Sequence, residues 1–140
     1  MKRKMLTLLG MLTLFVAAGS AHAQTIKVKG TIPFDFIVNR ATLPAGQYMI
    51  ESLGSVDGRT LLIRSSDMKP KASVNAFSLQ SLNTCERTKL VFHRYGDRYF
   101  LAEIWVAGKS SGHEVPKSPR EVEVAKDFTM QEVLLMAALH

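Results

Sequence analysis

The chain has few of the residues from which small proteins often build cross-links and metal sites. It contains one cysteine, Cys85, among 140 residues. A single cysteine excludes a disulfide within the chain and any metal site made from several cysteines. The sequence leaves two interpretations of Cys85 open: a buried, inert thiol or a disulfide between two chains. The length also excludes a two-domain enzyme, since one domain takes about 100–150 residues.

Catalytic and metal-binding spacings are also absent. The histidines beyond the first 23 residues are His93, His113 and His140, and none belongs to an H-x-H or H-E-x-x-H pattern. The chain has no C-x-x-C motif and no G-x-S-x-G nucleophile elbow. We therefore predict no metal, no cofactor and no catalytic residues, and we favour a non-catalytic protein.

Only one long hydrophobic run is present, and it lies at the N-terminus. Three basic residues at positions 2–4 precede an uncharged run over 5–19, and Ala21 and Ala23 form a small-x-small cleavage site. Fifteen helical residues would span roughly 22 Å, less than a ~30 Å hydrocarbon core. We predict a signal peptide over 1–23 and export to the periplasm or the exterior. No later run is long enough to predict a transmembrane segment.

The positive charge of the chain is partly a property of this signal. The full chain has 18 Lys and Arg against 12 Asp and Glu, a net charge of +6. Removal of residues 1–23 would leave 117 residues with a net charge of +3. The remaining basic residues are scattered singly, which argues against a nucleic-acid partner.

The rest of the chain, residues 24–140, is predicted to be one β domain. Apolar residues fall on every second position of most of the segment 26–38, and Pro33 places that strand at an edge or breaks it. A turn is predicted at 55–58. Further strands are predicted over 46–53, 59–64, 72–79, 89–95 and 98–106.

The last two of these strands flank Gly96-Asp97, which predicts a hairpin with a two-residue turn. The expected faces are Leu90, Phe92, Tyr99, Leu101 and Trp105 on one side, and Val91, Tyr95, Phe100, Ala102, Ile104 and Val106 on the other. Both faces are apolar, so we expect the hairpin to be covered on both sides.

Two segments near the C-terminus are ambiguous between helix and strand. The sequence Ser-Pro-Arg-Glu at 118–121 forms a capping box, which favours a short helix over 119–125 with Val122 and Ala125 on one side. Alternating valines leave a strand as the rival interpretation. The apolar tail over 133–139 is predicted as a strand, because a closing strand would remove a sheet edge, although a second capping box at 129–132 favours a helix.

The candidate ligand-facing residues all lie on the hairpin: His93, Arg94, Tyr99, Glu103 and Trp105. Glu103 interrupts an apolar run, so we expect it to pair with a cation such as Arg94 or Arg98, with a general acid of raised pKa as the alternative. The aromatic residues of the hairpin are expected to form the core, with stacking on a sugar as the alternative.

A series of motifs along residues 28–126 resembles an uncharacterised family of small secreted bacterial proteins that is abundant in acidobacterial genomes. The motifs are Ile32-Pro-Phe-Asp-Phe36, Leu43-Pro-Ala-Gly-Gln-Tyr48, Leu61-Leu-Ile-Arg-Ser65, Leu90-Val-Phe-His-Arg-Tyr-Gly-Asp97 with Tyr99-Phe-Leu101 and Ile104-Trp105, and Glu114-Val-Pro-Lys-Ser118 with Glu121 and Ala125. The resemblance implies a signal peptide followed by one mostly β domain with a β-like C-terminal segment. It implies no reaction, substrate or catalytic residue.

These observations predict an antiparallel β-barrel or β-sandwich of about seven or eight strands, with one short helix near the C-terminus. The leading functional hypothesis is an exported non-catalytic module that binds a small ligand or an envelope partner. The alternatives are a small hydrolase or isomerase with its site inside a barrel, and a structural envelope subunit that acts by oligomerisation.

Overall fold

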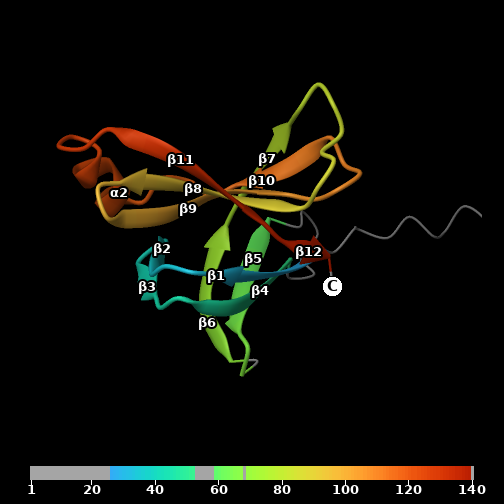
Figure 1. Ribbon diagram of the computed structural model, residues 1–140, viewed down its shortest axis with the longest axis horizontal. Coiled ribbons are helices and arrows are strands. Elements are labelled where there is room, and N and C mark those ends of the chain that lie inside the picture. Colours follow the sequence, from blue (N-terminus) through green and yellow to red (C-terminus); the bar gives the residue numbers. More distant parts are fainter. Residues whose placement is uncertain (1–25, 53–58, 68, 140) are drawn as a thin grey trace, which may run out of the picture.

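The computed structural model describes residues 26–52, 59–67 and 69–139 of the chain. This part contains twelve strands and one short helix, α2, which precedes the last two strands (Figure 1). The predicted signal peptide with Ala21 and Ala23 lies outside the described residues, and so does the turn predicted at 55–58.

The first sheet has five antiparallel strands in the order β12-β1-β4-β5-β6. Their bounds are Ala138–Leu139, Lys27–Ile32, Gly46–Ser52, Thr60–Ser65 and Pro70–Asn75. In β1 the side chains of Val28 and Ile32 are buried, while Lys27 and Lys29 are exposed. The predicted alternation of this segment is therefore confirmed, and it turns one face of the sheet toward the core.

The second sheet has seven strands, with β11-β8-β9-β10-β7 in order and β2 and β3 beside them. In the same order, the bounds of these strands are Met130–Met136, Lys89–Tyr95, Arg98–Trp105, Ser111–Glu114, Phe77–Gln80, Phe36–Val38 and Ala41–Leu43. Strand β2 pairs with β9 in parallel, through Ile37 and Phe100. The other strand pairs in the sheet are antiparallel.

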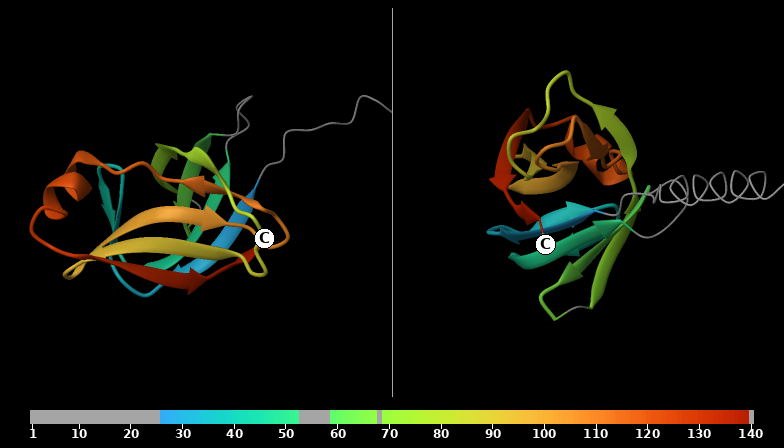
Figure 2. Two further views of the ribbon diagram at one scale, coloured as in Figure 1. Left: turned by 90° about the horizontal axis from the view of Figure 1, so that it is seen from above. Right: turned by 90° about the vertical axis from the view of Figure 1, so that its right-hand side faces the viewer.

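The two sheets lie one above the other, and the chain passes from one to the other through short links (Figure 2). Only Ala76 separates β6 from β7, and only Ala137 separates β11 from β12. Residues 33–35 link β1 to β2. Within the described ranges the two ladders do not close on each other. Of the two predicted architectures, β-barrel and β-sandwich, the barrel is therefore not shown.

Apolar side chains from both sheets fill the space between the layers. Phe92 is fully buried there, with its ring edge-to-face against Phe34 at 5.1 Å and Phe36 at 5.7 Å between centroids. Aromatic pairs of this geometry add to the free energy gained by burial. The prediction that the hairpin aromatics form the core is thus confirmed for Phe92.

The prediction of about seven or eight strands is too low, for two reasons. The segments predicted as single strands at 26–38, 72–79 and 133–139 each divide where the chain changes sheet, the first at Pro33 as expected. Strands β3 and β10 form in segments for which no strand was predicted. The tail is a strand, as predicted.

The β8–β9 hairpin has the predicted two-residue turn, with Gly96 at φ +63°. Its register shifts at Ala102, because Val91 lies opposite Glu103 while the next residue, Phe92, lies opposite Leu101. Such a bulge reverses the sides on which the following residues lie. The predicted faces are therefore wrong beyond Ala102: Ile104 is in the main core, and Trp105 is on the outer face.

Helix α2 (Pro119–Val124) begins at the predicted capping box. The backbone N–H of Glu121 donates to Ser118 Oγ at 3.2 Å, and Pro119 occupies the first helical position. This satisfies one of the backbone donors left open at a helix start. The sequence therefore predicted the helix and its start correctly.

The side that α2 buries differs from the prediction. Glu121 and Val124 are buried, whereas Val122 and Ala125 are exposed. The carboxylate can face inward because polar groups on β8 bind it. Val124 joins Ile37, Tyr95 and Phe100 in a small second core, so the hairpin is covered on both sides.

Candidate functional site

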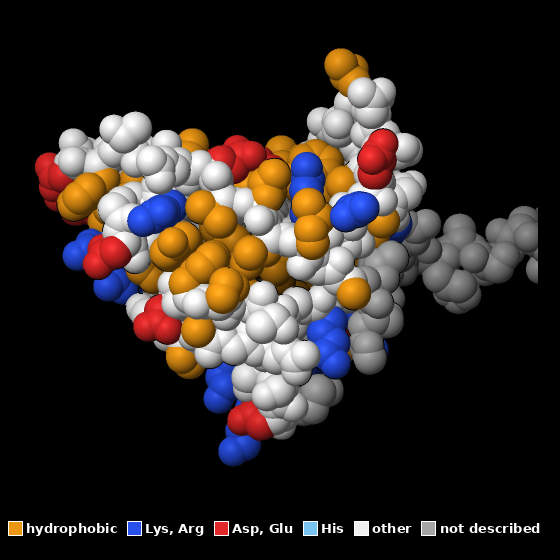
Figure 3. All heavy atoms as spheres, in the orientation of Figure 1, with side chains coloured by type: hydrophobic (Ala, Val, Ile, Leu, Met, Phe, Trp, Pro, Cys, Tyr) orange, Lys and Arg blue, Asp and Glu red, His pale blue; other side chains and the backbone are white. Residues whose placement is uncertain are grey.

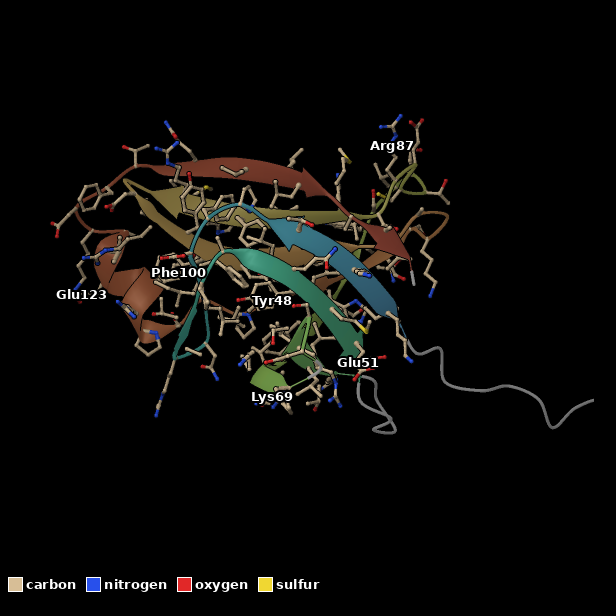
Figure 4. All side chains as sticks on the ribbon, turned by 60° about the horizontal axis from the view of Figure 1, so that its bottom comes forward. Tyr48, Glu51, Lys69, Arg87, Phe100 and Glu123 are labelled. Carbon is tan, nitrogen blue, oxygen red and sulfur yellow. The ribbon has the colours of Figure 1, made fainter. Side chains whose placement is uncertain are left out.

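The outer face of the second sheet has two different ends. Figure 4 shows Phe100 beside α2 at one end and Arg87, in the loop between β7 and β8, at the other. The first end is covered by the helix, and the second borders a cleft of about 470 Å³. That volume is within the range of about 300–1,000 Å³ typical of small-molecule sites. The cleft is therefore our candidate site.

Three segments far apart in sequence line this cleft: the β7–β8 loop with the first residue of β8, the end of β9 and the end of β11. The lining residues are Ser81, Asn83, Thr84, Cys85, Glu86, Arg87, Lys89, Glu103, Trp105 and Met136. Two of the predicted ligand-facing residues, Glu103 and Trp105, are among them. The loop residues and Met136 were missed, because only the packing of the sheets brings them to the hairpin.

Glu103 and Trp105 form the rigid floor of the cleft. They are two residues apart on β9, so their side chains share the outer face. The indole N–H of Trp105 donates to Glu103 Oε2 at 2.8 Å, and both side chains are half-buried. The expected partner of Glu103 was an arginine, so that prediction is wrong. The bond fixes the plane of the indole ring and leaves the second carboxylate oxygen for other partners.

Gly112 on β10 makes room for this indole. It lies opposite Trp105 in the ladder, and a Cβ at that position would be 2.7 Å from the ring atoms Cδ2 and Cε3. The ring therefore packs directly over the neighbouring backbone, as aromatic residues do over glycine in other sheets.

We expect Gly112→Ala to displace the indole and break its hydrogen bond to Glu103. The free energy of unfolding should fall by about 1–3 kcal/mol, as for other overpacked positions. The emission of Trp105, the one tryptophan of the chain, should shift with its surroundings. Gly46→Ala is the matched control, since a Cβ there would be 3.8 Å from Tyr48. An unchanged emission spectrum in Gly112→Ala would contradict this description of the floor.

The β7–β8 loop is held over the cleft by hydrogen bonds to the turn between β9 and β10. Cys85 N donates to Lys109 O at 2.9 Å, and Gly108 N donates to Cys85 O at 2.8 Å. Ser81 N donates to Ser110 O at 2.7 Å. The loop wall is thus tied to the same sheet that carries Trp105.

The thiol of Cys85 is half-buried in this wall, with Sγ 2.9 Å from the carbonyl oxygen of Arg87. It forms no disulfide in the structure. The disulfide between two chains stays a prediction.

The charges around the cleft balance. Arg87 and Lys89 contribute two positive charges, and Glu86 and Glu103 contribute two negative charges. Ser81, Asn83 and Thr84 add uncharged hydrogen-bonding groups. Such a lining does not favour a strongly charged ligand of either sign.

At the other end of the sheet, His93 belongs to a buried hydrogen-bonded cluster. Glu121 is 3% exposed, and its Oε2 accepts from the Tyr95 hydroxyl at 2.9 Å and lies 3.2 Å from His93 Nδ1. Burial, followed by the hydrogen bond and the negative charge of Glu121, raises the pKa of Tyr95 to about 12. The hydroxyl therefore stays protonated and holds α2 on the sheet.

This cluster predicts a loss of stability at alkaline pH. Because the pKa of Tyr95 is higher in the folded chain than its usual value of 10.0, its contribution is complete below pH 10 and is lost as the pH rises toward 12. A shift of this size corresponds to at most about 3 kcal/mol. Urea unfolding across this pH range should show the loss, and Tyr95→Phe should make it smaller. An equal alkaline loss in Tyr95→Phe would refute the role of Tyr95.

Arg94 and Tyr99 lie away from both the cleft and the buried cluster around Glu121. They are on the inner side of the sheet, at the rim of the core. Tyr99 stacks on Phe34 at 3.7 Å between ring centroids, and the guanidinium carbon of Arg94 is 5.5 Å from the Tyr99 ring centroid. Arg94 Nε also donates to Gly96 O at 2.7 Å. The structure thus distributes the five predicted residues over three places.

His113 lies on β10, in a segment for which no strand was predicted. Its Nδ1 atom is buried and has no hydrogen-bond partner in the described part of the chain. Burial, with a smaller effect of Lys109, lowers the pKa of His113, so the ring is neutral at neutral pH. We find no group of three or more His, Cys, Asp or Glu side chains that could hold a metal in the described ranges.

Comparisons with protein families, with characterised proteins and with solved structures gave no match. The family resemblance of the sequence therefore stays a prediction. No helix in the residues that the structure describes is long and apolar enough to cross a membrane.

Proposed function

We propose that this chain is an exported, non-catalytic module that binds a small saccharide in the cleft beside Trp105. The observation that carries the proposal is the fixed indole ring of Trp105, held by Glu103 and packed over Gly112 at the floor of the cleft. A flat aromatic surface with hydrogen-bonding groups around it suits a ligand that has both an apolar face and many hydroxyls.

The chemistry of the lining favours a sugar over other small ligands. The axial C–H groups of a sugar ring carry a slight positive charge and pack against the negative face of an indole. The hydroxyls of the sugar can bond to the carboxylate of Glu103 and to the cations of Arg87 and Lys89, and such charge-assisted bonds are stronger than neutral ones. The two positive and two negative side chains of the lining compensate each other. A neutral ligand can therefore bind without leaving an uncompensated charge in the cleft.

The hydrolase alternative expects a cavity inside the fold lined by Glu103, His93 or an arginine. Glu103 lines the open cleft on the outer face, and His93 is bound to Glu121 under α2. The space between the sheets is occupied by apolar side chains. These placements support a binding module over an internal active site.

The fluorescence of Trp105 tests the proposal directly, because this residue is the one tryptophan in the chain. The protein, expressed from its full sequence and purified, would be titrated with neutral, N-acetylated and acidic mono- to tetrasaccharides. We expect saturable changes in emission with neutral or N-acetylated sugars. Saturation by acidic sugars alone, or by none of the panel, would overturn the proposal.

A further inference from the structure

Strand β11 forms a long open edge of the second sheet. In the described part of the chain it pairs with β8 alone, over all seven residues from Met130 to Met136. The views in Figure 2 place it at the margin of its layer. Every second backbone N–H and C=O of such a strand points away from the sheet and can pair with another strand.

This edge lacks the features by which proteins usually prevent such pairing. Edge strands are commonly short, or they carry lysine, proline or a bulge. The edge strand β6 begins at Pro70, contains Lys71 and pairs with β5 through a register shift. By contrast, β11 has no lysine, no proline and no register shift, and its one charged residue is Glu132.

Both sides of the β11 edge carry apolar side chains. On the outer side Met130, Leu134 and Met136 are 44–57% exposed. On the inner side Val133 and Leu135 are partly exposed at the rim of the core. Figure 3 shows hydrophobic side chains gathered between the two layers on this face of the molecule. A strand added along β11 would cover both groups.

The sequence of β11 fits an antiparallel copy of itself. A two-fold axis through Val133 keeps the inner and outer faces in register, since residues an even number of positions apart share a face. It places Met130 opposite Met136 of the second copy and Glu132 opposite Leu134 of the second copy. Shifting the axis to Glu132 would instead place two carboxylates opposite each other, which is unfavourable.

We propose that two copies of this chain associate through β11, in the register centred on Val133, to form one continuous sheet. The interface is separate from sugar binding at Trp105, so either proposal can fail without the other. The two meet only at Met136, which also borders the cleft.

Two substitutions of Leu134 test whether β11 forms the interface and whether its register is centred on Val133. Leu134 is 47% exposed, so neither change should unfold the protein. Leu134→Glu would place two carboxylates opposite each other at each of two symmetric sites, and we expect a monomer. Leu134→Lys would place an ammonium group opposite each Glu132, and we expect the dimer to persist.

Sedimentation equilibrium of the purified protein gives the mass, and Phe77→Lys on the opposite edge strand β7 is the control, expected to stay dimeric. A monomeric wild-type protein, a dimer in Leu134→Glu, a monomer in Leu134→Lys or a monomer in Phe77→Lys would each overturn the proposal.

Discussion

Trp105→Ala is expected to weaken saccharide binding by roughly thirtyfold or more. Truncation of an aromatic side chain at the centre of a binding site commonly costs about 2 kcal/mol or more, and about 1.4 kcal/mol corresponds to a factor of ten in affinity. Trp105 supplies the floor of the cleft, and among the residues that the structure describes no other aromatic side chain lines it. Calorimetric titration measures the loss, since the variant has no tryptophan to report by fluorescence.

The control for this result is Trp105→Phe. It keeps a flat ring over Gly112 but removes the N–H that donates to Glu103. We expect a loss of affinity between those of the wild type and Trp105→Ala. Thermal unfolding of both variants checks that the fold is intact. If an intact Trp105→Ala variant bound sugar as tightly as the wild type, the indole would not be the binding surface.

Phe92→Ala is expected to lower the free energy of unfolding by about 3–5 kcal/mol. Phe92 is fully buried at the centre of the sandwich, and its ring packs edge-to-face against Phe34 and Phe36. Removing it creates a cavity that the two surrounding sheets cannot readily fill. Urea denaturation gives the change in free energy.

Phe128→Ala provides the contrast, because that ring is 51% exposed. We expect this substitution to change the free energy of unfolding by no more than about 0.5 kcal/mol, as at most surface positions. Similar losses of stability in the two variants would show that Phe92 does not occupy the centre of the core.

The sequence predicted the strands well where alternation extends over many residues. Alternation depends only on which face is buried, and it identified β1 correctly. The Gly96-Asp97 turn between two apolar runs identified β8 and β9. It could not show the bulge at Ala102, because the register of a hairpin depends on its partner strand as well as its turn. Because the bulge at Ala102 reverses the sides of the residues that follow it, Trp105 lies outside the core and Ile104 lies within it.

Tertiary contacts decided the remaining differences. The capping box predicted where α2 begins, but its buried side depends on the hydroxyl of Tyr95 and the ring of His93, which satisfy Glu121. Glu103 and Trp105 stood out in the sequence as a charge and a large aromatic residue in one strand. The loop over them could not be predicted, since backbone bonds between Cys85 and Lys109 hold it there.

Mapping of backbone amide chemical shifts during a sugar titration shows whether the sugar binds in the cleft beside Trp105. The probe is the saccharide that gives the strongest fluorescence response. We expect the shifted resonances to be those of residues 81–89, 103–105 and 136, which line the cleft or directly adjoin its lining residues. Shifts centred on α2 or on the five-stranded sheet, with the cleft residues unchanged, would contradict it.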